Sequence, residues 1–244
     1  MINLALSLLA GALVAIAVVL SQLPIWAAIV PAVIVFAVTY LLLARRISNK
    51  VQAIATLAQK ELSVQPANPR ERQARIDKGI KLLEQGLVYD KWQFLVGSEL
   101  HAQIGMVHYM VKNYDVAMPH LLKANARNYM AKAFQGALYY QRKDYKAMEK
   151  AFEAAVISGK KEPIIWAVYA WCLLQLKERE KAIKVMARAV EKNPSEEKLK
   201  TGMSALQNDK RLKMRPYEPM WWQFGLESPP VDMGGGRRVQ YLRR

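Results

Sequence analysis

The sequence predicts an all-α protein: a pair of transmembrane helices, then a solenoid of about three helical hairpins with a capping helix, then an extended C-terminal tail. Three observations lead to this prediction. Residues 1–44 contain no charged side chain, although the whole chain has a net charge of +16. One pattern of small, aromatic and turn residues occurs three times between Gly105 and Pro194. Residues 211–244 are rich in proline and glycine, which is typical of extended segments.

The uncharged segment consists of two apolar runs, roughly residues 3–20 and 25–44. Each is near the length of about 20 residues that crosses a bilayer as a helix. Only four residues, 21–24, separate the runs, so the sequence predicts a transmembrane hairpin. A cleaved signal peptide is the alternative, and it fits less well because no basic residue precedes the first run and a second run follows it. Small residues suited to close helix contact occur in both runs: Gly11, Ala12, Ala15, Ala27, Ala28 and Ala32.

Basic residues follow the second run directly, at Arg45, Arg46 and Lys50. The positive-inside rule places this end in the cytoplasm, and the short hairpin returns the N-terminus to the same side. The predicted location is therefore an integral membrane position, in a bacterial inner membrane with the repeat domain cytoplasmic. A single cysteine is compatible with a reducing compartment.

Four regions follow from the pattern of the chain: the transmembrane hairpin (1–44), an amphipathic juxtamembrane helix and linker (45–69), a helical repeat domain (70–208) and a basic tail (209–244). The juxtamembrane helix has an apolar stripe at helical spacing, and the prolines of 65–69 end it. The stripe consists of Ile47, Val51, Ile54, Ala58 and Leu62. Two sites are expected for this helix: it lies at the membrane surface, or it packs on the repeat domain.

Helix boundaries in the repeat domain are predicted from polar capping residues. Asp90 followed by Gln93 resembles a capping box, which predicts a long helix from there through Val107. Ser195 after Pro194 predicts the start of a last, capping helix. That helix would cover the stacking face that the final repeat otherwise exposes.

The clearest repeat runs from Pro163 to Pro194 and carries Trp166, Tyr169-Ala170, Leu173, Ala182, Met186 and Ala189. The copy before it, 129–162, is 34 residues long and carries Gly136, Tyr139-Tyr140, Tyr145, Phe152 and Ala155. An earlier copy carries Gly105, Tyr109, Tyr114, Ala117, Leu121 and Ala124. Over about residues 98–208 this pattern resembles the tetratricopeptide (TPR) family of helical hairpins. It departs from the family at Met148, where a small residue is usual, and at Pro119, inside the second helix of the first copy.

The resemblance implies a concave, partner-binding groove lined by the first helix of each hairpin. By register this groove is apolar and aromatic, which suits an apolar helix or an extended hydrophobic segment of a partner protein. The alternative is that these residues pack under the tail or the juxtamembrane helix. The predicted groove residues are Met106, Tyr109, Met110, Ala137, Tyr140, Gln141, Trp171, Leu174 and Gln175.

Residues that could carry chemistry are few. His101, His108 and His120 could meet across one hairpin and bind a metal, but they also occupy packing positions, which is the favoured interpretation. Cys172 is predicted to be a core residue, and Glu149 and Glu153 a solvated face. The sequence therefore predicts a protein that is not an enzyme, with no catalytic residue, no metal and no cofactor.

The tail contains Trp221, Trp222 and Phe224, which are predicted to be an anchor because soluble surfaces rarely expose such a cluster. The bilayer interface is the favoured site, since Lys210, Arg211, Lys213 and Arg215 lie just upstream and could meet anionic headgroups. The groove near Tyr140 and a partner protein are the alternatives. Net positive charge could also attract nucleic acid, but the chain lacks a nucleic-acid reading module, so membrane and acidic protein are favoured.

Two functions remain open at this point. The first is a membrane-anchored adaptor or scaffold that binds a protein partner through the apolar groove. The alternative is a constitutive structural subunit of a membrane complex, for envelope assembly or secretion, without a separable groove. The sequence identifies neither the partner nor the pathway.

Overall fold

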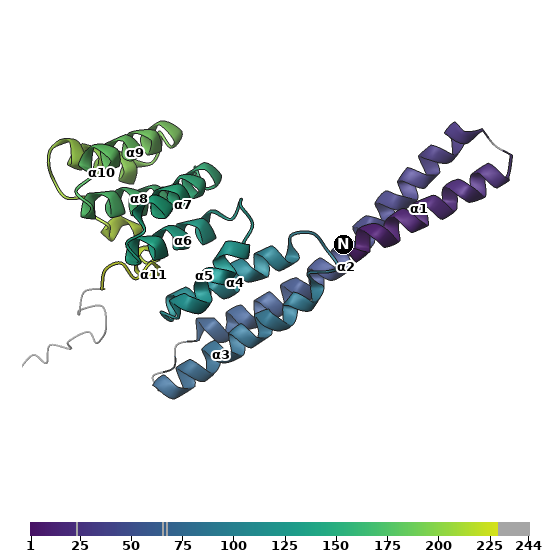
Figure 1. Cartoon of the computed structure of the whole chain (residues 1–244), viewed down its shortest axis with the longest axis horizontal. Helices are drawn as coiled ribbons and strands as arrows, with labels where there is room; N and C mark the ends of the chain where they lie inside the picture. Colours follow the sequence, from purple (N-terminus) through teal and green to yellow (C-terminus); the bar gives the residue numbers. More distant parts are fainter. Residues whose placement is uncertain (23, 65, 67, 229–244) are drawn as a thin grey trace, which may run out of the picture. The chain divides into compact units, whose positions relative to one another are not determined.

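A computed structural model describes the whole chain except residues 23, 65, 67 and 229–244. Arg237-Arg238 and Arg243-Arg244 of the predicted basic tail lie outside the described residues. Within the described residues all regular structure is helical, as predicted (Figure 1). The α-helices are α1 (Ile2–Leu20), α2 (Ile25–Ser63), α3 (Pro69–Gly86), α4 (Val96–Met110), α5 (Tyr114–Lys123), α6 (Tyr129–Gln141), α7 (Tyr145–Ser158), α8 (Pro163–Gln175), α9 (Arg179–Lys192), α10 (Glu197–Gln207) and α11 (Met220–Gln223). Two 3₁₀ turns are η1 (Leu87–Tyr89) and η2 (Arg215–Tyr217).

The chain divides into two compact units, residues 1–131 and 132–244, and the boundary falls in the first turn of α6. In the first unit α1 packs along α2. α1 buries Asn3, Ser7 and Gly11, which are spaced by one helical turn and form a stripe of small or polar residues. A Cβ atom at Gly11 would lie 3.0 Å from the Ala32 carbonyl oxygen, so the two backbones are in close approach there. Close contacts at small residues are typical of packed membrane helices, although they also occur elsewhere.

Both helices turn large apolar side chains outward. Leu13 is 67% exposed on α1 and Leu41 is 65% exposed on α2. By length and composition, Ile2–Leu20 and the helix from Trp26 to Ser63 are the two described helices apolar enough to cross a membrane. The core helix of a soluble protein would be mostly buried, whereas these are mostly exposed.

α2 continues without a break from the apolar segment through the predicted juxtamembrane helix, a length of about 58 Å at 1.5 Å per residue. Its predicted apolar stripe packs on α3 and α4: Ala58 lies in one buried cluster with Leu83, Leu100 and Ile104. The stripe therefore packs on protein, which was one of the two expected sites.

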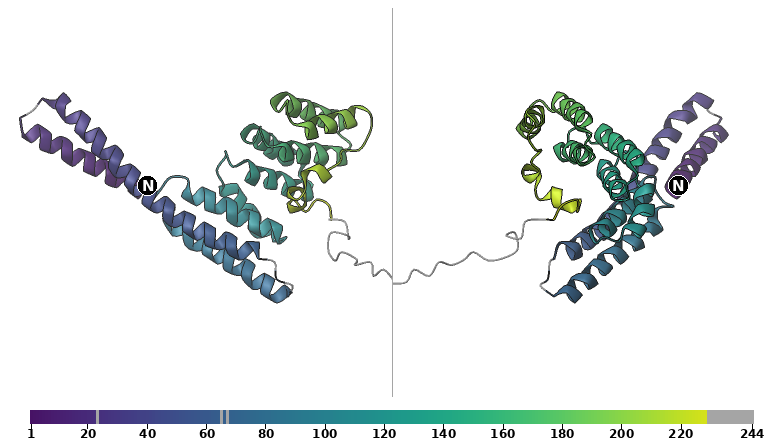
Figure 2. Two further views of the ribbon diagram at one scale, coloured as in Figure 1. Left: turned by 180° about the vertical axis from the view of Figure 1, so that it is seen from behind. Right: turned by 60° about the vertical axis from the view of Figure 1, so that its left-hand side comes forward.

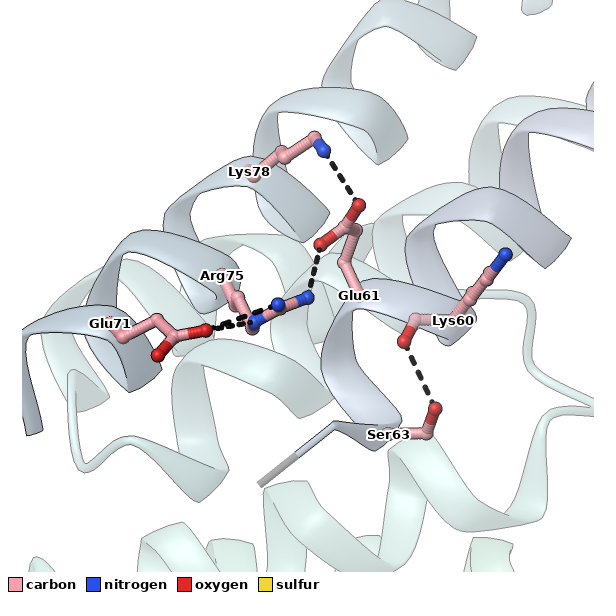
Figure 3. Close-up of polar contacts among 6 residues, drawn as sticks. All are labelled: Lys60, Glu61, Ser63, Glu71, Arg75 and Lys78. Atoms are coloured by element: carbon pink, nitrogen blue, oxygen red, sulfur yellow. Dashed lines mark hydrogen bonds and ion pairs between the residues drawn. The ribbon is translucent and has the colours of Figure 1, made fainter. Parts of the chain in front are cut away.

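Ion pairs fix the end of α2 to α3 (Figure 3). The Glu61 carboxylate accepts hydrogen bonds from Lys78 at 2.6 Å and from Arg75 at 3.2 Å, and Arg75 also pairs with Glu71. The hydrogen bond from Lys78 lowers the pKa of Glu61 below its ordinary value, and Arg75 adds to the effect. The apolar part of α2 and its charged end are thus one continuous helix, and ion pairs hold that end on α3.

The capping prediction at Asp90 is wrong. α4 begins at Val96, and its N-cap is Leu95, which adopts a left-handed conformation with φ of 70°. Residues 87–95 form η1 and irregular turns instead. The Asp90 carboxylate nevertheless lies beside the amino end of α4, because it fills the space that a Cβ atom at Gly97 would need. Ser195 is not an N-cap either, since α10 is preceded by Glu196.

The first helices of the three predicted repeats, α4, α6 and α8, end in the same way. Lys112, Lys143 and Lys177 have φ of 62°, 61° and 63°. At the first of these, the Lys112 N–H donates to the Tyr109 carbonyl and the Asn113 N–H donates to the His108 carbonyl, which is the Schellman arrangement. The same pair of bonds follows α6 and α8, and again α10, where Asp209 has φ of 55°. Repetition of this turn supports the internal periodicity read from the sequence.

In the second unit α8 is the central helix. It packs against α7, α9, α10 and α11, and every residue from Ile164 to Leu173 is buried. This explains why its sequence is apolar on all sides. α6 approaches α7 closely at Gly136, where a Cβ atom would be 2.7 Å from the Phe152 ring.

Candidate functional site: an aromatic face occupied by the tail

The predicted groove residues on α4 do not share one open surface. Tyr109 is 1% exposed and packs its ring 5.3 Å from that of Tyr114, so it belongs to the core of the α4–α5 pair. Met106 lines a hollow with Glu99 and Asn128, whereas Met110 lines another with Arg75 and Leu62. Sequence register could not show this, because helix position alone does not tell which neighbour covers a side chain.

On α6 and α8 the predicted residues do come together. Tyr140 and Trp171 meet edge to face with ring centroids 5.9 Å apart. Ala137 is fully buried, Gln141 and Leu174 are half-buried, and Gln175 is exposed. We call the surface formed by Phe134, Tyr140 and Trp171 the aromatic face. Phe134 is not among the groove residues predicted from the sequence. It is three residues before Ala137 and seven before Gln141, so the helical spacing could have placed it on the same stripe of α6.

The segment that ends in α11 folds back beside α8 (Figures 1 and 2). Its side chains cover the aromatic face. Trp221 is 1% exposed and meets Trp171 edge to face at 5.1 Å. Phe224 is 0% exposed and stacks on Phe134 at 4.8 Å. Trp221 and Phe224 of the predicted anchor thus pack on the aromatic face, which includes Tyr140, the place of the alternative site. Residues 211–228 are not simply extended, because η2 and α11 fold them back.

The segment before α11 is held on α10. Leu212, Met214 and Tyr217 are buried, and a Cβ atom at Gly202 would touch Leu212. The Tyr217 hydroxyl donates to the Lys198 carbonyl at 3.3 Å, and burial raises the pKa of Tyr217 to about 12. Arg179 donates to the Leu206 carbonyl at 2.6 Å and so ties α9 to the end of α10.

Two polar groups of the tail, both on tryptophans, lack hydrogen-bond partners. The indole N–H groups of Trp221 and Trp222 are both buried, and neither has an acceptor among the described residues. A buried donor without a partner costs about 1–3 kcal/mol. The aromatic contacts of the tail are therefore opposed by an energetic penalty at the same place.

The three histidines cluster between α4 and α5. His101 Nδ1 lies 3.1 Å from His120 Nδ1, and the His108 and His120 rings are 6.1 Å apart. Burial lowers the pKa of each imidazole below its ordinary value. For His120 the neighbouring histidines and Lys123 lower the pKa further; Asp90 near His101, and Glu84 and Asp77 near His108, act in the opposite direction. Among the described residues, no group of three or more His, Cys, Asp or Glu side chains could hold a metal ion.

The other polar candidates have structural roles. Cys172 is fully buried, and burial raises the pKa of its thiol far above the ordinary range, so the reactive thiolate is disfavoured. Glu153 makes a two-pronged ion pair with Arg188 at 2.8 and 2.9 Å, and Glu149 pairs with Lys181. These two glutamates connect α7 to α9 through ion pairs. The sequence predicted only a solvated helix face for them.

Arg45, Arg46 and Lys50 are all exposed on α2, just beyond its apolar part. The Lys50 ammonium group lies 5.9 Å from the centre of the Tyr89 ring, a cation–π distance.

No protein-family model, no curated protein and no solved structure matches this chain.

Proposed function

We propose that the protein is a membrane-anchored, TPR-like scaffold that binds an apolar, aromatic segment of a partner protein on the aromatic face. It would act as a binding protein rather than as an enzyme. α1 and α2 would form a transmembrane hairpin in a bacterial inner membrane, with both termini and the helical repeats in the cytoplasm. The observation that carries the proposal is the seating of Trp221 on Trp171 and of Phe224 on Phe134.

This contact indicates what kind of ligand the face accepts. A short helix with inward rings at Trp221 and, directly after its end, at Phe224 is the type of hydrophobic segment that helical grooves bind. The tail would then be an internal ligand that a partner segment displaces. Its two unsatisfied indole N–H groups favour displacement, because both can bond to water once the tail leaves the face, which removes their cost.

Membrane anchoring is supported by the exposed apolar surfaces of α1 and α2 and by the basic residues that follow. The continuous helix α2 would hold the first unit next to the bilayer. The proposed cytoplasmic side depends on the positive-inside rule applied to Arg45, Arg46 and Lys50.

A structural subunit is the second candidate, and one observation favours it. Leu212, Met214 and Tyr217 are as well buried as the repeats themselves, which suits a tail that is a permanent part of the core. In that case the aromatic face would never open.

A peptide-binding experiment separates the two candidates. The full-length variant Trp221→Ala/Phe224→Ala is placed in nanodiscs, and a fluorescent peptide of residues 212–226 is titrated against it and against wild type. A tethered tail competes at an effective concentration of roughly 1 mM, so a peptide with Kd of about 10 μM should bind wild type about a hundredfold more weakly than the variant. A peptide carrying the same two alanines is the control.

If the protein is an adaptor, the peptide should bind the variant and raise its melting temperature. A folded variant that binds the peptide no better than wild type would contradict the adaptor reading. A variant that loses its structure and is not rescued by the peptide would favour the structural subunit.

A further inference from the structure

The turn between α3 and α4, residues 87–95, is bonded to the first residues of α1. The Ile2 N–H donates to the Lys91 carbonyl at 2.9 Å, and the Asn3 N–H donates to the Trp92 carbonyl at 3.1 Å. The N-terminal ammonium group also donates to the Lys91 carbonyl. These carbonyls satisfy amide groups that the amino end of a helix otherwise leaves unpaired. The turn therefore lies at the point where the first apolar helix begins.

The packing of α1 on α2 shows which residues of α2 lie beside the start of α1. Gly11 faces Ala32 and Phe36. Counting back along α1 and onward along the antiparallel α2 places Ile2 about opposite residues 41–45. That is where the apolar part of α2 gives way to Arg45 and Arg46. The turn, the start of α1 and the first charges of α2 thus share one level.

The turn exposes apolar side chains at this level. Val88 is 70% exposed, Phe94 is 61% exposed and Leu95 is 47% exposed. Leu95 also adopts a left-handed backbone conformation, which is unfavourable for a residue other than glycine. Clustered exposed apolar residues of this kind mark a surface that contacts something other than water.

The charges around the turn suit an anionic surface. Lys91, Arg45, Arg46 and Lys50 are all exposed. Asp90 is the one acidic residue of the turn, and its carboxylate lies against Gly97 in the first turn of α4, where the helix dipole favours negative charge. Aromatic residues beside basic ones are typical of the interface between headgroups and acyl chains.

We propose that residues 87–95 form an interfacial membrane contact, in which Val88, Phe94 and Leu95 enter the headgroup region beside α1. Lys91 and Arg45 lie beside the anionic headgroups. The contact gives the first unit a third attachment to the bilayer and fixes the tilt of α2. This inference rests on the proposed membrane anchoring by α1 and α2.

Nitroxide spin labels measure the depth of the turn. Phe94→Cys, Val88→Cys, Leu13→Cys and Leu122→Cys are made one at a time in the full chain, and wild type, whose only cysteine is buried, is the blank. The proteins are reconstituted in vesicles of phosphatidylethanolamine and phosphatidylglycerol. Relaxation by oxygen, which concentrates in lipid, is compared with relaxation by a water-soluble nickel complex. Leu13 is the reference for the span, and the 55% exposed Leu122 of α5 is the reference for water.

We expect labels at Phe94 and Val88 to favour oxygen, at a depth between the two references. Labels at Phe94 and Val88 that match Leu122 overturn the inference while leaving the anchoring intact. Labels shielded from both reagents show that protein covers the turn, and also overturn it. A water-exposed label at Leu13 refutes the anchoring itself, and the inference with it.

Discussion

Replacing Gly136 by leucine tests the register of the second unit. A Cβ atom at this position would lie 2.7 Å from both Cδ2 and Cε2 of Phe152, well inside contact distance. The Phe152 ring cannot retreat easily, because it is fully buried and stacks on Tyr169 at 5.2 Å with an angle of 13° between the rings. α6 and α7 must therefore separate to admit the new side chain.

The magnitude follows from two opposing effects. Overpacking of this kind costs about 3 kcal/mol, at the upper end of the usual range. Leucine has a better helix propensity than glycine, which returns about 1 kcal/mol. The net loss of about 2 kcal/mol should lower the melting temperature by roughly 8–16 °C for a unit of this size. Tryptophan fluorescence of the full chain in detergent follows this unit, since Trp166, Trp171, Trp221 and Trp222 all lie in it.

Two controls sharpen the test. Lys150→Leu adds leucine to an exposed position of α7 and should change the stability by no more than about 0.5 kcal/mol. Phe152→Ala alone should cost about 3–5 kcal/mol, but combined with Gly136→Leu it should cost less than the sum of the single losses, because the leucine fills the vacated space. A Gly136→Leu melting temperature within about 2 °C of wild type, or strict additivity in the double variant, would show that this helix contact is wrong.

Three further predictions concern the histidine cluster, the contact between α1 and α2, and the membrane topology. In the folded protein the pKa values of the clustered histidines are lowered from the ordinary value of about 6.5, so unfolding takes up protons at acidic pH. The free energy of unfolding should therefore be highest above pH 6.5 and should fall as the pH drops from 7 to 5. In His101→Gln/His120→Gln the melting temperature should depend less on pH over the same range, and an unchanged dependence would remove the cluster as its cause. Gly11→Leu should lower the thermal stability of the protein in detergent, because its side chain meets α2, whereas Ala12→Leu on the exposed side should not; equal effects would contradict the α1–α2 contact. A reporter enzyme active only in the periplasm, fused after Arg244, should be silent, and strong activity would reverse the proposed topology.

Features governed by local residues were predictable from the sequence. The starts of α6, α7 and α8 at Tyr129, Tyr145 and Pro163 follow from the repeat pattern. The apolar stripe of residues 47–62 was recognisable because its spacing matches the helical period. Close approaches at Gly136 and Gly105 were also recognisable, since only the smallest residue fits between packed helices.

Features governed by distant contacts were not predictable. Asp90 has the spacing of a capping residue, but the chain between it and α4 is bonded to the N-terminus, and that contact overrides the local preference. Tyr109 has the register of a groove residue, yet Tyr114 covers it. The tail cluster could be recognised as an anchor from its composition, but its seat depended on the geometry of Phe134 and Trp171, which no local pattern encodes.

The central claim is that the tail occupies the aromatic face in the resting protein, and hydrogen–deuterium exchange of the full chain in nanodiscs tests it most directly. The tail contains backbone hydrogen bonds, among them Tyr217 N–H to the Met214 carbonyl and Phe224 N–H to the Trp221 carbonyl. We expect slow exchange across residues 212–224 in wild type, and fast exchange there in Trp221→Ala/Phe224→Ala with α1 to α5 unchanged. Complete exchange of residues 212–224 at the earliest time point in wild type would contradict the claim.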